Sequence, residues 1–157
     1  KFTKTNNESS KITHGLKIIK KNIVFEENYW KVNAAHDGYL KRFGIVHERD
    51  IEFYPEQFKF IGRDKIISRN FIKNLKFDIR FHLEPNIKIM KTQDKKSILI
   101  DLNGEGWKFN CDNNHMNVDN GLYFGKKDSY INNKNIIISG MTNNESHIIK
   151  WEITKLS

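Results

Sequence analysis

The sequence has few of the residues on which disulfide-stapled, helical or membrane-spanning folds depend. A single cysteine, Cys111, excludes an internal disulfide framework and a zinc site built from several cysteines. Alanine, the strongest helix former, occurs only as Ala34 and Ala35, which argues against a helical bundle. The longest aliphatic runs, such as residues 136–138, are far too short to cross a bilayer.

Short catalytic signatures are also missing. There is no glycine-rich phosphate loop, no Gly-x-Ser-x-Gly elbow and no His-Glu-x-x-His zinc motif. Cys111 lies in a strand-like run, which favours a small core residue over a nucleophile. We expect His14, His115 and His147 at the surface because their surroundings are polar. No catalytic residue, metal ligand or cofactor is therefore assigned to this segment.

The abundant residues favour β-structure. The chain contains 22 isoleucines and 11 phenylalanines, which fit pleated surfaces, and 19 asparagines, which fit turns. Its 157 residues correspond to one domain. Residues 1–10 are polar and are expected to form a flexible lead-in, followed by a single domain over residues 11–157. We interpret the chain as a fragment of a longer protein, because it opens without methionine or a signal-like apolar stretch.

Short runs that alternate apolar and polar residues follow one another, each closed by Gly, Asn, Asp or Pro. The clearest is residues 77–83, which Pro85 ends because proline cannot donate to a strand ladder. The pattern predicts an all-β fold of ten or so strands, an antiparallel two-sheet β-sandwich. We expect strands at residues 29–36, 45–54, 77–83, 87–90, 97–102, 107–111, 135–139 and 147–156.

The formal net charge is +8, which suits a polyanion such as an anionic glycan or nucleic acid. However, 22 of the 27 cationic residues are lysines. Arginine is better suited to bind phosphate or carboxylate, because its planar guanidinium donates two parallel hydrogen bonds. A solvated lysine-rich surface therefore accounts for most of these charges.

Two pairs of polar residues stand out on strand faces. By alternation, His47 and Arg49 share a face with apolar neighbours, so they are either hydrogen-bonded in the core or line a cleft. Arg80 and His82 lie on the face opposite the apolar residues of their strand. Arg49 and Arg80 are candidates for bidentate binding of a carboxylate or sulfate.

A third pair flanks the turn at Gly38, where we favour a buried hydrogen-bonded corner over a functional role for His36 and Tyr39. The spacing of His36, His47 and His82 supports a metal site poorly, and none is assigned. The candidate substrate contacts are thus His36, Tyr39, His47, Arg49, Arg80 and His82.

Several spaced segments, in order, resemble the heparinase II/III family of polysaccharide lyases. They are residues 35–49 (AHDGYLKRFGIVHER), 62–64 (GRD), 80–85 (RFHLEP), 103–107 (NGEGW) and 149–151 (IKW). The resemblance runs from about residue 11 to the end and concerns the C-terminal β-sandwich portion of that family.

The resemblance implies a parent enzyme that cleaves uronic-acid glycans by β-elimination. In the family, the carboxylate-neutralising Asn or His and the Tyr acid/base lie in an N-terminal α/α-toroid. A further His and the metal ligands lie early in the β-region, in stretches that do not occur here. The resemblance therefore implies that this segment is inactive alone, that a divalent metal belongs to the parent chain if anywhere, and that the enzyme is periplasmic or secreted.

Three functions remain as alternatives. The first is the lyase domain, with the toroid and an acidic polysaccharide as partners and no membrane. The second is a stand-alone module that binds an anionic glycan through its basic surface. The third, a nucleic-acid binder, ranks last because no stacking motif or recognition helix is visible.

Overall fold

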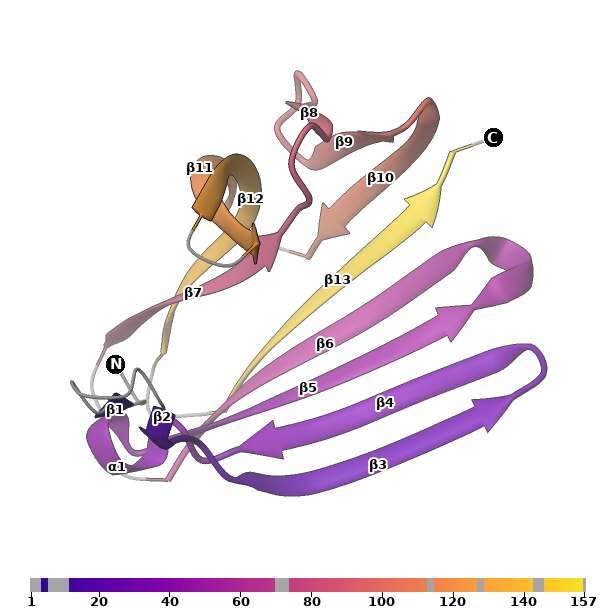
Figure 1. Ribbon diagram of the computed structural model, residues 1–157. Coiled ribbons are helices and arrows are strands. Elements are labelled where there is room, and N and C mark those ends of the chain that lie inside the picture. Colours follow the sequence, from indigo (N-terminus) through magenta and orange to yellow (C-terminus); the bar gives the residue numbers. More distant parts are fainter. Residues whose placement is uncertain are drawn as a thin grey trace.

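The computed structural model describes residues 4–5, 12–69, 74–112, 115–126, 129–142 and 146–156 (Figure 1). Within these residues, eight strands form one large antiparallel sheet and three form a smaller one. The large sheet runs, in spatial order, β3 (Ile18–Glu26), β4 (Tyr29–His36), β5 (Ile45–Tyr54), β6 (Lys59–Ser68), β13 (His147–Lys155), β10 (Glu105–Cys111), β9 (Ser97–Leu102) and β8 (Lys88–Lys91).

The small sheet has the order β11 (His115–Lys126), β12 (Ser129–Thr142) and β7 (Leu75–His82). A separate pair joins β1 (Lys4–Thr5) to β2 (Ile12–His14). The helical elements are single turns, α1 (Leu40–Phe43) and the 3₁₀ turn η1 (Pro55–Gln57). The predicted all-β, antiparallel two-sheet fold is therefore confirmed.

The core lies between the small sheet and β13, β10 and β9 of the large sheet, and it extends to Ile45 on β5 and Ile66 on β6. Ile98, Phe109 and Ile138 come from three different strands and are fully buried there. The ring of Phe81 on β7 packs edge-on against Trp151 of β13, with the centroids 4.9 Å apart. Aromatic and β-branched residues thus fill the space between two pleated surfaces, as expected for strands that bury one face.

The part of the large sheet formed by β3 to β6 has two chemically different faces. On its outer face, β5 carries a row of three buried carboxylates, Glu48, Asp50 and Glu52. Lysines from the neighbouring strands cover this row, for example Lys20, whose Nζ lies 2.8 Å from Glu48. The inner face carries apolar and aromatic residues together with the candidate site. This alternation confirms that His47 and Arg49 share a face with apolar neighbours.

Most predicted strands agree with the structure to within a few residues, but three strands of the two sheets were missed, as was the short β1–β2 pair. β3 is an edge strand exposed along nearly its whole length, so burial imposes little alternation on its sequence. β11 also lies at a sheet edge and mixes polar and apolar residues. No strand was predicted over β6, although the motif at residues 62–64 lies within it. β12 extends beyond the predicted 135–139 at both ends, and its first four residues are exposed, so burial imposes no alternation there.

The predicted flexible lead-in over residues 1–10 falls largely outside the described residues; within it, Lys4–Thr5 pair with β2. The side chains of His14 and His115 also lie outside the described part. His147, expected at the surface, is half-buried with its ring 5.8 Å from that of Phe77. Cys111 packs against the core. Across the described ranges, no helix is long and apolar enough to cross a bilayer.

Candidate functional site

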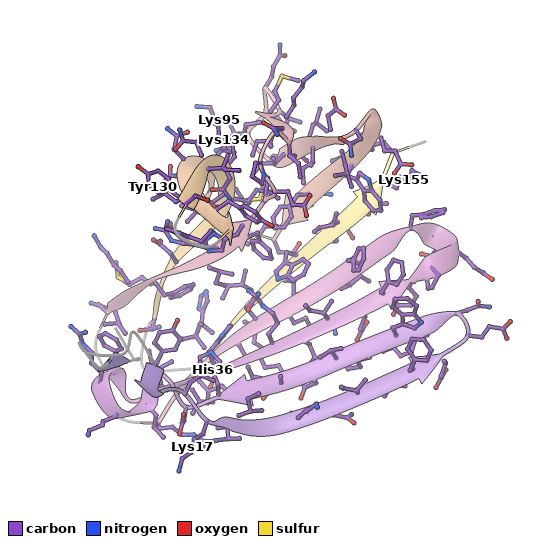
Figure 2. All side chains as sticks on the ribbon, in the orientation of Figure 1. Lys17, His36, Lys95, Tyr130, Lys134 and Lys155 are labelled. Atoms are coloured by element: carbon purple, nitrogen blue, oxygen red, sulfur yellow. The ribbon has the colours of Figure 1, made fainter. Side chains whose placement is uncertain are left out.

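A cavity of about 570 Å³ lies between β7 and the inner face of β4, β5 and β6. Its floor is apolar and includes Phe43, Ile45 and Ile66, whereas its walls carry histidine, arginine and lysine. Figure 2 shows His36 at one end of this space, where the large sheet approaches α1 and β2. All six candidate contacts from the sequence line the cavity: His36, Tyr39, His47, Arg49, Arg80 and His82.

The six residues reach the cavity in different ways. His36, His47 and Arg49 stand on the inner face of the large sheet, and Tyr39 follows β4 in the turn before α1. Arg80 and His82 instead have exposed side chains on the outer face of the small sheet. The Arg80 guanidinium donates to Asp78 over 3.1 Å, also on that face.

Arg80 and His82 border the cavity through their main chain. In an antiparallel pair, every second residue directs its N–H and C=O toward the neighbouring strand. The N–H of Leu83 donates to the carbonyl of Lys134, so the odd-numbered residues of β7 bond β12. The N–H and C=O groups of four even-numbered residues that line the cavity therefore point to the edge of β7 that pairs with no strand among the described residues: Lys76, Asp78, Arg80 and His82.

A buried carboxylate, Asp64 on β6, organises the polar wall. Its side chain has no exposed surface and accepts four hydrogen bonds. His47 Nε2 lies 2.6 Å and Arg49 Nε 2.7 Å from Oδ1. Arg49 Nη2 lies 3.2 Å and Trp151 Nε1 2.8 Å from Oδ2. Burial alone raises the pKa of Asp64, but the bonds from His47, Arg49 and Trp151 outweigh it and hold that pKa below its usual value.

The network continues through two histidines to the turn at Gly38. His47 Nδ1 lies 3.3 Å from His36 Nε2, and the Gly38 N–H donates to His36 Nδ1 over 3.2 Å. These contacts are mutually satisfied when both rings are neutral, with His36 donating to His47 and His47 donating to Asp64. Burial, followed by the proximity of His47, lowers the pKa of His36, which favours this state. The corner expected around Gly38 is therefore hydrogen-bonded at His36, but His36 and Tyr39 are half-buried and not buried as expected.

The guanidinium of Arg49 is already held on two sides. Asp64 occupies its Nε and one terminal nitrogen, and the ring of Phe81 lies 5.2 Å from its Cζ. Asp64 thus engages the bidentate edge expected to bind a ligand, and Nη1 is the guanidinium nitrogen outside this pair of bonds. The wall can offer one cationic donor, main-chain groups of β7 and an apolar floor, a combination that fits a polar group with several hydroxyl or acidic oxygens.

Sequence reasoning did not assign a role to Asp64, Trp151 or the edge of β7. Asp64 occupies an inner-face position two residues after Gly62, and its charge on an apolar face was the available signal. The β7 edge leaves no mark in the sequence, because it depends on which strand lies beside β7. No metal cluster of three or more His, Cys, Asp or Glu side chains is found in the ranges given above.

Comparison with known proteins relates this chain to a group of lyases. Residues 6–152 match the family model described as heparinase II/III-like, C-terminal. The fold resembles heparan sulfate lyase HepC from Pedobacter heparinus, with a TM-score of 0.74 and 10% identity over 92% of this chain. It also resembles a heparinase III gene product, with a TM-score of 0.69 and 14% identity over 92% of this chain. The chain spans only 22% of either structure. No curated protein sequence matches it.

Proposed function

This chain belongs to the heparinase II/III-like family as its C-terminal domain, and on this premise we propose that it is the β-sandwich domain of a lyase cleaving uronic-acid glycans by β-elimination. The family match over residues 6–152 is the observation that carries the proposal. The solved structures of like fold are described as a heparan sulfate lyase and a heparinase III, which supports an acidic polysaccharide as substrate.

Elimination of this kind makes three demands on an enzyme. The uronate carboxylate is neutralised so that the neighbouring C5 proton becomes acidic, a base removes that proton, and an acid protonates the leaving oxygen. We place these groups in the N-terminal part of the parent chain, the α/α-toroid. The present domain then supplies one wall of the glycan cleft, without a catalytic residue of its own.

The cavity beside β7 is the proposed glycan contact. Its wall offers Nη1 of Arg49 and the histidine pair on one side, and alternating main-chain donors and acceptors on the other. Sugar hydroxyls both donate and accept hydrogen bonds, and a uronate or sulfate group prefers a cationic donor. The convergence of all six candidate residues on this one cavity supports the assignment.

Conservative variants of the full-length enzyme test this contact. We expect His36→Gln and Tyr39→Phe each to raise KM on a uronic-acid glycan by about 2- to 10-fold, the size of one or two neutral hydrogen bonds, with kcat little changed. Tyr123→Phe, on β11 away from the cavity, is the matched control. An unchanged KM in both cavity variants would remove the cavity from the glycan path.

The alternative is a stand-alone module that binds an anionic glycan through its +8 charge. The coding sequence upstream of Lys1 decides between the two. Several hundred residues of paired helices containing the missing motifs would support the lyase, whereas a start codon or secretion signal alone would refute it. In the second case, salt-sensitive binding of the purified chain to heparin-like or alginate-like polymers would be expected.

Two expectations rest on the family resemblance alone. We propose that the parent enzyme is periplasmic or secreted, where its polymer substrates are found. A divalent metal, if the parent holds one, is assigned to residues outside this segment. A secretion signal in the upstream sequence and a metal analysis of the full-length enzyme test these two points.

A further inference from the structure

Four aromatic rings form a continuous stripe across the inner face of the large sheet. Phe25, Trp30, Phe53 and Phe60 come from β3, β4, β5 and β6 and lie opposite one another in register. Successive ring centroids are 5.1, 5.0 and 4.2 Å apart. Phe60 packs against the core, but exposure then increases outward to 40% at Trp30 and 74% at Phe25. We call these four residues the aromatic stripe.

The next inner-face row extends this apolar surface. Ile23 on β3 and Val32 on β4 face each other in register and are 54% and 44% exposed. Isolated apolar residues are normal on protein surfaces, whereas a contiguous patch marks an interaction site. The stripe and this row together form one such patch.

The outer face of the same strands is ionic, in contrast to the apolar inner face. There, Glu52 is paired with Lys31 at 3.2 Å and with Arg63 at 2.8 Å. A sheet with one ionic and one apolar face needs a second layer on the apolar side. The small sheet provides that layer over β13, β10 and β9, but among the described residues nothing covers the outer half of the stripe (Figure 1).

We propose that the aromatic stripe is the surface on which the N-terminal part of the parent chain docks, an inference that rests on the proposed function. This chain covers only 22% of each related solved chain, so most of each of those proteins consists of residues that have no counterpart in this domain. A covalently linked partner is present at high effective concentration, which suits a patch of modest size.

The position of the stripe relative to the cavity favours this occupant. Along β4, inner-face positions run from Trp30 through Val32 to His36, from the stripe to the cavity wall. Trp30 and His36 lie at opposite ends of β4, so a partner that covers the inner face along this strand reaches from the stripe to the cavity. The inner face of the sheet then has two contact regions. The apolar stripe packs against the partner, and the polar cavity wall is where the glycan is proposed to bind.

The ring geometry disfavours a glycan on the stripe itself. Phe25 and Trp30 are stacked with 23° between their planes, and Phe53 and Phe60 with 20°. Each stacked pair covers one face of each of its two rings, so the stripe offers fewer open ring faces than four isolated rings would. A sugar ring stacks on an aromatic face, whereas an apolar protein surface packs against both the faces and the edges of rings.

Hydroxyl-radical footprinting of the full-length chain, read by peptide mass spectrometry, tests the proposal. Phe124 on β11 is the internal reference, because its 71% exposure nearly equals the 74% of Phe25 in this domain. We expect Phe25 and Trp30 to be at least several-fold less oxidised than Phe124, at every protein concentration. Equal oxidation would overturn the proposal. Protection that appears only at concentrations where the chain dimerises, or only with added glycan, would overturn it in favour of those occupants.

A matched pair of variants gives a second readout. In the full-length chain, Phe25→Lys should lower the Tm by roughly 2–4 °C, whereas Phe124→Lys should leave it unchanged. Equal shifts would contradict a docking role for the stripe. Failure of the docking surface can be told apart from failure of the proposed function. An active lyase whose stripe is fully oxidised refutes the docking surface alone, whereas an upstream sequence without an N-terminal domain refutes the lyase assignment.

Discussion

Asp64 shows how one residue determines the character of the candidate site. Its carboxylate is fully buried on an otherwise apolar face and is held by His47, Arg49 and Trp151 from both neighbouring strands. A buried charge is tolerated only when it is paired and hydrogen-bonded, so these four residues form one unit. Arg49 and His47 are consequently fixed in position before any ligand arrives.

Removing this carboxylate should be costly. We expect Asp64→Ala to destabilise the fold by about 3–5 kcal/mol, because the cation of Arg49 would stay in place without its partner. Asp78→Ala, which removes the exposed partner of Arg80, should cost only about 0–1 kcal/mol. Urea unfolding of both variants measures the difference, and comparable losses would show that the Asp64 network is not a buried unit.

Glu48 should contribute to the loss of stability in acid. The pKa of the Glu48 carboxyl is lowered from an ordinary value of 4.5 to about 2, and the main cause is the hydrogen bond that Lys20 donates to it. A carboxyl whose pKa is lower in the folded state stabilises the fold above about pH 4.5 and loses that contribution as the pH falls toward 2. We expect Glu48→Gln to flatten the stability profile in this window, measured by thermal unfolding. Glu56→Gln, at an exposed position in η1, is the control and should leave the profile unchanged.

Among the elements, β6 and β13 show a close approach of the Trp151 ring to the main chain of Gly62. A Cβ atom at this position would lie 2.0 Å from ring atoms of Trp151, the residue opposite it in register. The glycine therefore creates the space in which the indole lies flat and donates to Asp64.

Gly62→Ala should displace that ring and destabilise the protein by about 1–3 kcal/mol through overpacking. Gly15→Ala is the matched control, because no heavy atom lies within 4 Å of the corresponding Cβ position. Chemical denaturation compares the two variants. A neutral Gly62→Ala would mean that Trp151 can move without loss of the network.

The same elements show how far a sequence pattern predicts strands. Residues 29–36, 45–54 and 97–102 were predicted with the bounds that β4, β5 and β9 have in the structure. These strands bury one face, so their sequences alternate clearly. β3 was missed because it is exposed along nearly its whole length, so burial imposes little pattern on its sequence. The candidate residues were found from polar groups on apolar faces, but their convergence on one cavity required the pairing of distant strands.

For the whole molecule, the decisive prediction concerns activity. We expect the purified 157-residue chain to release no unsaturated uronate from uronic-acid glycans, because the proposed base and carboxylate-neutralising group belong to the rest of the parent enzyme. An assay with heparan-sulfate-like and alginate-like polymers checks this. Product formation by the chain alone would place a catalytic residue within this domain.

The sequence by itself determined the all-β class, the antiparallel sandwich and the family, because these depend on local alternation and on motifs read in order along the chain. It also located His47 and Arg49 on an apolar face. Only the tertiary structure decided that Asp64 occupies the bidentate edge of Arg49, that the edge of β7 opposite β12 lines the cavity, and that four rings form a stripe. Such features arise from strands brought together from distant parts of the chain, and no local pattern encodes which strand becomes the neighbour of another.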